Sequence, residues 1–109
     1  MADWLYDTDG VPYWIVDPAD KDGYGFDLTT DEWLESGESV SSVTWTVPAG
    51  LTKVTNFPNY TSGEYNAGGI IKVALTGGTA GTDYDVLAHW VTSLGRERDR
   101  TFRLRVQQR

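Results

Sequence analysis

From Ser39 onward the chain alternates apolar and polar residues with a period of two, which is the pattern of β-strands. In the clearest run, Val43, Trp45 and Val47 alternate with serines and threonines until Pro48 ends the strand. The same alternation predicts strands over residues 24–28, 51–57, 71–75, 84–92 and 101–106, and a polar, glycine-rich loop over 61–69. Helical spacing is nearly absent, so the pattern predicts an all-β fold.

Six or seven short strands with regular turn signals are typical of an antiparallel β-sandwich of the immunoglobulin or fibronectin type; a small barrel fits less well. Tyr84, at the start of the penultimate strand, stands where such sandwiches place a corner tyrosine. Trp45 and Trp90 are in phase with their strands and are expected in the core. Residues 29–32 resemble a capping box that opens one helical turn, which Trp33 would pack against the sandwich.

The last two predicted strands form a hairpin through residues 93–96. If it closes near Gly95, Asp85 lies opposite Arg105 and Leu87 opposite Arg103 on the outward face. Opposite charges across paired strands stabilise a sheet, so this register gives some of the arginines a structural role.

Charge is distributed unevenly along the 109 residues, whose net charge is −7. Residues 1–38 hold eleven acidic residues and one lysine, whereas residues 96–109 hold six arginines and two acidic residues. The two ends either neutralise each other within the fold or contact other proteins. An acidic chain is repelled by a polyanion, so nucleic acid is not expected as a partner.

Catalytic and metal-binding patterns are absent or incomplete. His89 shares a predicted strand face with Asp83 and Asp85, but no motif supplies a nucleophile beside it. The aspartates of residues 17–23 do not fit the register of a calcium loop, and the chain has no cysteine. We therefore predict no enzymatic activity, no cofactor and no metal. No apolar run is long enough to span a membrane, and no export signal opens the chain.

The first 16 residues differ from the rest and are predicted to form an extended arm, with the sandwich domain over residues 17–109. The arm mixes acidic residues with large apolar ones, namely Trp4, Leu5, Tyr6, Tyr13, Trp14 and Ile15. Free segments in water are normally poor in aromatic residues. The arm therefore either adds a strand to its own domain or docks on another chain.

Several segments together resemble a known family. They are Asp17-Pro18, Trp33-Leu34 and residues 24–28, 37–48, 75–84 and 95–106, of which the Ser-x-x-Trp strand, the glycine-rich loop before Tyr84 and the Gly-Arg hairpin are the most specific. In these residues the chain resembles the small fibre–tail adaptor proteins of tailed bacteriophages. The resemblance implies an Ig-like sandwich without catalysis that joins the tail or neck to fibres or neighbouring virion proteins.

The leading hypothesis is therefore a structural adaptor, made in the host cytoplasm and present in the virion in several copies around a symmetric tail. Its expected interface consists of Trp4, Leu5, Tyr6, Tyr13, Trp14 and Ile15, with Arg96 and Arg98 as an electrostatic contact. The alternative is a carbohydrate-binding sandwich in which Trp4, Trp14 or Tyr60 stacks on sugar rings.

Overall fold

The alternating pattern produces two packed sheets. The computed structural model describes residues 5–29 and 34–108, and these form nine strands and no helix. The strands are β1 (Leu5–Tyr6), β2 (Pro12–Val16), β3 (Lys21–Asp27), β4 (Val40–Thr46), β5 (Leu51–Lys53), β6 (Glu64–Ala67), β7 (Ile70–Gly77), β8 (Asp83–Thr92) and β9 (Glu97–Val106). Sheet A has the order β1-β2-β9-β8-β4; in sheet B, β7 pairs with β3, β5 and β6.

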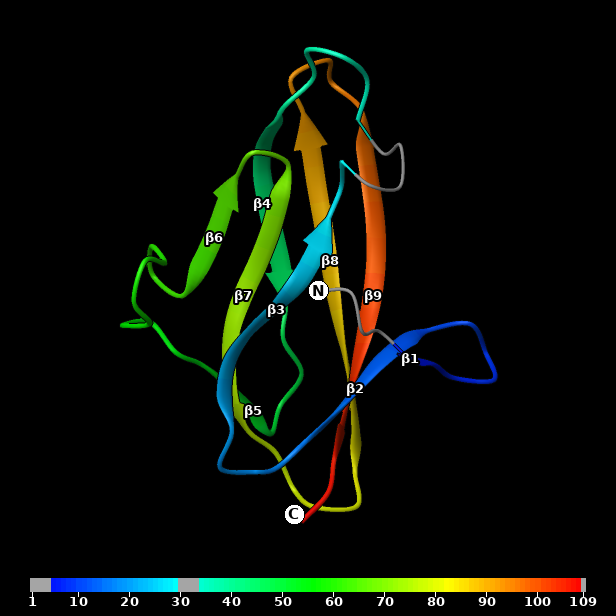
Figure 1. Ribbon diagram of the computed structural model, residues 1–109, viewed down its shortest axis with the longest axis vertical. Helices are drawn as coiled ribbons and strands as arrows, with labels where there is room; N and C mark the ends of the chain where they lie inside the picture. Colours follow the sequence, from blue (N-terminus) through cyan, green and yellow to red (C-terminus); the bar gives the residue numbers. More distant parts are fainter. Residues whose placement is uncertain (1–4, 30–33, 109) are drawn as a thin grey trace.

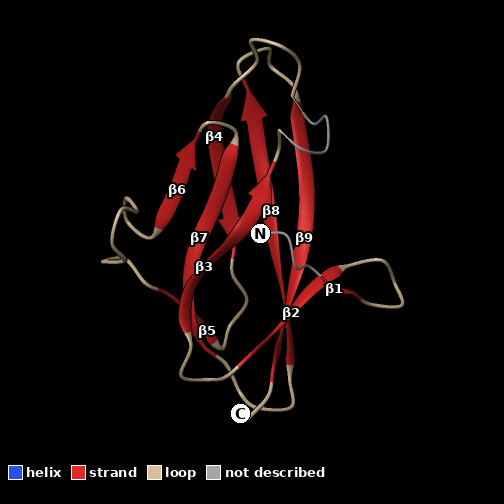
Figure 2. Cartoon of the chain, in the orientation of Figure 1, coloured by secondary structure: helices blue, strands red, loops and turns tan. Residues whose placement is uncertain are grey.

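The two sheets stack face to face, with β3 of sheet B crossing in front of β8 and β7 lying in front of β4 of sheet A (Figure 1). Figure 2 shows strands and loops throughout the described residues, so the predicted all-β sandwich is confirmed. The hairpin formed by β1 and β2 projects from one side of the sandwich, and β4 lies toward the other side. The predicted capping box and Trp33 fall on residues 29–33, of which 30–33 lie outside the described residues.

Two expectations about the strands are corrected. The sandwich is not wholly antiparallel, because β2 runs parallel to β9, with Trp14 opposite Leu104. The expected loop over residues 61–69 contains β6, which pairs with β7 through a tight turn at Gly68 and Gly69. Both glycines have positive φ, 60° and 81°. A Gly-Gly pair of this conformation is a standard signal for a two-residue hairpin and could have revealed β6.

The register of the hairpin between β8 and β9 differs from the expected one by two residues. Asp85 lies opposite Arg103 rather than Arg105, and Leu87 lies opposite Thr101 rather than Arg103. The cause is the position of the turn, because Val91 pairs with Glu97 and the hairpin is therefore centred one residue before Gly95. Turn length fixes the register of a hairpin, so this small displacement changes every cross-strand pair.

The core lies between the sheets and is built largely from aromatic rings. Phe102 of β9 is fully buried, and its ring contacts those of Tyr24, Phe26 and Trp45 at centroid distances of 6.2, 5.9 and 6.1 Å. Trp90 is fully buried, as expected, whereas Trp45 is half-buried because β4 is an edge strand. The inward-facing side chains of the two sheets thus form a single apolar core between them.

Tyr84 has the hydrogen bond expected of a corner tyrosine. Its hydroxyl accepts a hydrogen bond of 2.9 Å from the backbone N–H of Thr79, five residues upstream. The pKa of Tyr84 is lowered, chiefly by hydrogen bonding with Thr79. This bond fastens the glycine-rich loop over residues 77–82 to the start of β8.

The core arrangement predicts a large loss of stability for Phe102→Ala. The substitution removes a fully buried ring that contacts both sheets, and such a change costs about 3–5 kcal/mol of the free energy of unfolding. Urea unfolding followed by tryptophan fluorescence measures this loss. The control is Leu94→Ala, because Leu94 is 59% exposed in a turn and its truncation should change stability by no more than about 0.5 kcal/mol. Equal effects of the two substitutions would contradict the assigned core.

Candidate functional site

The second half of the predicted arm is a strand of the sandwich. Residues 12–16 form β2 and pair along their length with β9, and β1 pairs with β2 through Leu5 opposite Tyr13 and Tyr6 opposite Pro12. Of the two placements expected for the arm, the described residues have the one in which it adds strands to its own domain. Docking of its exposed side chains on another chain stays a prediction.

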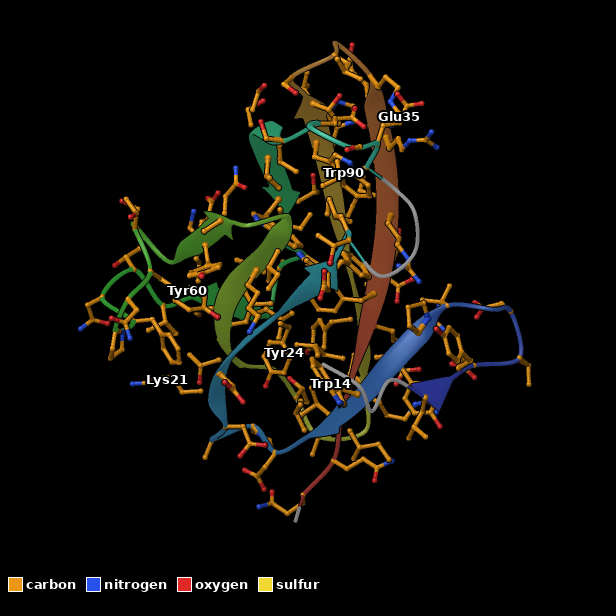
Figure 3. All side chains as sticks on the ribbon, turned by 45° about the horizontal axis from the view of Figure 1, so that its top comes forward. Trp14, Lys21, Tyr24, Glu35, Tyr60 and Trp90 are labelled. Atoms are coloured by element: carbon orange, nitrogen blue, oxygen red, sulfur yellow. The ribbon has the colours of Figure 1, made fainter. Side chains whose placement is uncertain are left out.

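The arm residues expected at an interface are placed on different faces. Leu5 and Tyr6 are 48% and 62% exposed at the edge of sheet A. Tyr13 and Ile15 are half-buried on the outward face, and Trp14 points between the sheets, where its ring lies edge-on to Tyr24 at 5.2 Å. Figure 3 shows Trp14 directed toward Tyr24. Trp4 lies outside the described residues. Within the described arm, only Leu5 and Tyr6 expose large apolar side chains to solvent.

A network of ion pairs fixes the hairpin of β1 and β2 to the outward face of sheet A. Arg103 donates to Asp7 at 2.7 Å, to Asp9 at 3.0 Å and to Asp85 at 2.6 Å. Arg105 also donates to Asp7 and binds Asp83 at 3.1 Å. The side chains of Arg103 and Asp7 are only 13% and 19% exposed, so this pair is shielded from solvent, whereas Asp9 and Asp85 are about half exposed.

The same network explains the charge asymmetry of the sequence. The arginines lower the pKa of Asp7 and Asp9, with hydrogen bonding from Arg103 the largest cause in each case. The pKa of Arg103 is raised by Asp85, Asp9 and Asp7, in that order. Part of the acidic head therefore neutralises part of the basic tail within the fold, as one of the two expected readings had it.

Arg96 also forms an internal pair rather than presenting a bare charge. Its Nε donates to Glu38 at 3.0 Å and its Nη2 forms a second hydrogen bond to the same carboxylate. The carboxylate of Glu38 is fully buried and also accepts a hydrogen bond of 2.8 Å from the backbone N–H of Glu35. The pair joins the loop before β4 to the turn between β8 and β9. Arg98 is exposed on β9, opposite Trp90.

Arg96 is the largest cause of a low pKa at Glu38, which falls to about 2. Arg96 is held at Glu38, because a buried carboxylate that loses its arginine partner destabilises the fold. The predicted role of Arg96 and Arg98 as an electrostatic contact stays a prediction, and Arg98 is the more accessible of the two.

His89 does not form part of a nucleophilic triad within the described residues. Its Nδ1 contacts Asp99 and its Nε2 lies 3.0 Å from Glu97, both on β9. Hydrogen bonding with Asp99, followed by that with Glu97, raises the pKa of His89. The two carboxylates face the imidazole across the strand pair, so the histidine completes a cross-strand charge cluster.

The aromatic residues of the carbohydrate alternative are mostly packed. Tyr60 contacts the rings of Phe57 and Tyr65 at 5.0 and 5.6 Å, and its hydroxyl lies so close to Gly23 that a Cβ there would be 1.8 Å away. Its pKa is raised, mainly by burial. Figure 3 shows Tyr60 lying toward the sandwich. Trp14 lines a shallow cavity of about 240 Å³ together with Asp20, Asp22 and Tyr24.

Other kinds of site find no support in the described part of the chain. There, no three histidine, aspartate or glutamate side chains are placed to hold a metal ion. No helix of residues 5–29 and 34–108 is long and apolar enough to cross a membrane.

Sequence reasoning missed the contact of Asp7 and Asp9 with Arg103. The signal was present as two aspartates directly before Gly10, a turn residue with a φ of 84°, between two aromatic segments. Reading these as a hairpin would have placed β1 beside β2. The parallel pairing with β9 carries no comparable local signal.

The buried pair of Arg96 and Glu38 predicts a specific pH dependence. A carboxyl group with a lowered pKa stabilises the fold above its unfolded pKa, near 4.5, and this contribution is lost as the pH falls through about 2. We expect Glu38→Gln to be less stable than the parent protein at neutral pH, with the difference shrinking between pH 4.5 and 2. Urea unfolding at a series of pH values measures it. Glu35→Gln removes a neighbouring carboxylate but keeps the pair, and should show no such convergence.

The ion-pair network predicts that Arg103→Gln loosens the hairpin of β1 and β2. Loss of the charge breaks the contacts with Asp7 and Asp9, so the amides of residues 5–11 should exchange with solvent several-fold faster. Hydrogen exchange with mass spectrometry measures this change. Lys72→Gln, which removes a positive charge from sheet B, serves as the control. Unchanged exchange in Arg103→Gln would show that backbone pairing alone holds the hairpin.

No curated protein matches the chain. A family model described as "Podophage GP4 fiber-tail adaptor protein gp77" matches residues 16–105, which include every strand from β3 to β8 and nearly all of β9. The match begins at the last residue of β2, so most of the projecting hairpin precedes the matched region. The chain belongs to the family of podophage fibre–tail adaptor proteins.

Proposed function

We propose that the protein is a non-enzymatic structural adaptor that joins the tail of a podophage to its fibres and uses the hairpin of β1 and β2 as a docking element. The observation that carries this proposal is the family match over residues 16–105. The exposed apolar side chains of Leu5 and Tyr6 on the projecting hairpin support the choice of surface.

The hairpin has the properties of a preorganised binding element. Asp7 and Asp9 hold it against Arg103, so its backbone is positioned before any partner arrives. Rigid presentation lowers the conformational entropy that binding must overcome. Tyrosine is among the residues enriched at energetic hot spots of interfaces, and the exposed Leu5 adds apolar surface beside Tyr6.

Assembly around a tail would require several copies of the adaptor. Each copy could then bind its neighbours weakly, because repeated contacts around an axis sum to a strong attachment. A role of this kind needs rigid surfaces rather than reactive groups. The side chain of His89 is 39% exposed and is held by contacts with Asp99 and Glu97 of β9, which is in keeping with such a role.

The carbohydrate alternative is less well supported. Sugar-binding sites require aromatic faces that are open to solvent, whereas Tyr60 is packed on Gly23 and between Phe57 and Tyr65. Trp14 points between the sheets, where its ring packs edge-on against Tyr24. We therefore propose the adaptor role alone.

A phage that carries Leu5→Ser together with Tyr6→Ser tests the proposal. Because both side chains are exposed, the variant should fold normally, and its incorporation into purified particles should fall by about tenfold or more. Quantitative mass spectrometry of particles measures incorporation of the adaptor and of the fibres. Leu94→Ser, which alters an exposed leucine at the far hairpin, is the matched control. Full incorporation of the double variant would exclude the hairpin as the docking element.

A further inference from the structure

A shallow cavity lies where the chain crosses from β2 of sheet A to β3 of sheet B. Its volume is about 240 Å³. Strand β1 pairs with β2 only at Pro12 and Tyr13, and β3 is the outermost strand of sheet B. Among the described residues, no strand therefore pairs with the end of β2 on this side or lies beyond β3. The residues that line the cavity are Trp14, Ile15, Val16, Asp20, Asp22 and Tyr24.

Two aromatic rings form the apolar wall of the cavity. Trp14 of β2 lies edge-on to Tyr24 of β3, with 5.2 Å between the ring centroids. Tyr24 is buried and also contacts the ring of Phe102 in the core, so the sandwich holds this wall in place. Trp14 is half-buried, which leaves part of its indole accessible from the cavity. Aromatic rings attract cations, and tryptophan does so most strongly.

Two carboxylates line the same cavity. The backbone N–H of Asp17 donates a hydrogen bond of 2.9 Å to Asp20, and that of Gly23 donates one of 2.8 Å to Asp22. These bonds restrict both side chains to positions beside the aromatic wall. Asp22 is exposed, so its carboxylate can accept further hydrogen bonds from a ligand.

The charge of these carboxylates is not balanced within the cavity. None of the described residues that line it is basic. Lys21 lies between the two aspartates in the sequence, but side chains alternate along a strand and Lys21 is directed away from Trp14 and Tyr24 (Figure 3). The cavity therefore combines aromatic rings with negative charge, which is the complement of a cationic group.

The size of the cavity favours a single side chain over a whole small molecule. Pockets for small molecules usually have volumes of about 300 Å³ or more, and this cavity is smaller. Among cationic side chains, arginine matches both parts of the lining. Its planar guanidinium stacks on aromatic rings, donates several hydrogen bonds to carboxylates and is more weakly hydrated than the ammonium group of lysine. Arginine is also enriched at the energetic hot spots of interfaces.

We propose that this cavity binds an arginine side chain of a partner protein, with the guanidinium against Trp14 and hydrogen-bonded to Asp20 and Asp22. The site goes beyond the proposed function, because it adds a second contact and specifies the chemistry of the partner. It does not depend on Leu5 or Tyr6. Because the sandwich fixes its wall and backbone hydrogen bonds hold its carboxylates, the site is preformed and binding requires little ordering.

Titration of the purified protein with N-acetyl-arginine amide tests the proposal. Assigned proton–nitrogen correlation spectra at low ionic strength report on the cavity through the indole of Trp14 and the amides of residues 20–24. These signals should shift in a saturable manner. N-acetyl-citrulline amide has a similar shape but no charge and should bind about tenfold more weakly, because it loses the ionic and cation–π contributions. N-acetyl-lysine amide with a free side-chain amine should also bind more weakly than the arginine probe.

Two variants locate the binding site. Asp22→Asn keeps the size of the side chain but removes its charge, and should weaken binding of the arginine probe about threefold. Asp27→Asn is the matched control, because it removes the same charge from the other end of β3, outside the lining of the cavity. It should leave the affinity unchanged. Well-dispersed spectra of both variants verify that they are folded.

Four results would overturn the proposal. Equal affinities for the arginine and citrulline probes would show that charge plays no part, and equal affinity for the lysine probe would remove the preference for arginine. Equal losses in Asp22→Asn and Asp27→Asn would show general attraction to an acidic surface. If the signals of Trp14 and residues 20–24 do not shift, the cavity is not an arginine site. None of these results bears on the adaptor role, because that proposal is judged by incorporation into particles.

Discussion

The parallel pairing of β2 with β9 is the contact on which the arrangement of this molecule depends. It joins the beginning of the chain to its end and makes the N-terminal segment a strand of sheet A. Trp14 can then pack on Tyr24 of sheet B, while Tyr13 on the opposite face meets the guanidinium of Arg105 at 4.3 Å from its ring. The position of β1 at the edge follows from the position of β2. Without this pairing, only the ion pairs of Arg103 and Arg105 and the packing of Trp14 on Tyr24 would hold the projecting hairpin.

Electrostatics then sets the orientation of what the pairing attaches. Arg103 and Arg105 lie on β9 next to β2. They form ion pairs with carboxylates of β8 and with carboxylates of the hairpin of β1 and β2. Such shielded pairs contribute more to the choice of one geometry than to stability, because desolvation offsets much of their attraction. The net charge of −7 is therefore a poor guide to the surface. Among the edge strands, β4 is the longest one without a charged residue.

The sequence predicts what depends on local pattern. Strands β4, β7 and β8 follow from alternation, and Tyr84 follows from its place after a glycine-rich loop. The β8–β9 register was wrong by two residues, because a turn can close at neighbouring positions with similar local energies. The pairing of β2 with β9 was beyond prediction, since it joins segments about ninety residues apart and depends on the packed sandwich. The site shows the same division: exposed Leu5 and Tyr6 could be inferred, but not the partners of the arginines.

Joining the two ends of the chain also has a consequence for when the protein becomes competent. Strand β9 is the last to be synthesised and is the central neighbour of both β2 and β8. A nascent chain can form the pairs of β7 with β3 and β6 early, yet its sheet A has no place for β2 until the residues near Val106 have left the ribosome. The edge formed by β1 therefore takes its place in sheet A only after β9 has been made. A chain that lacks β9 thus lacks the surface that we propose for docking.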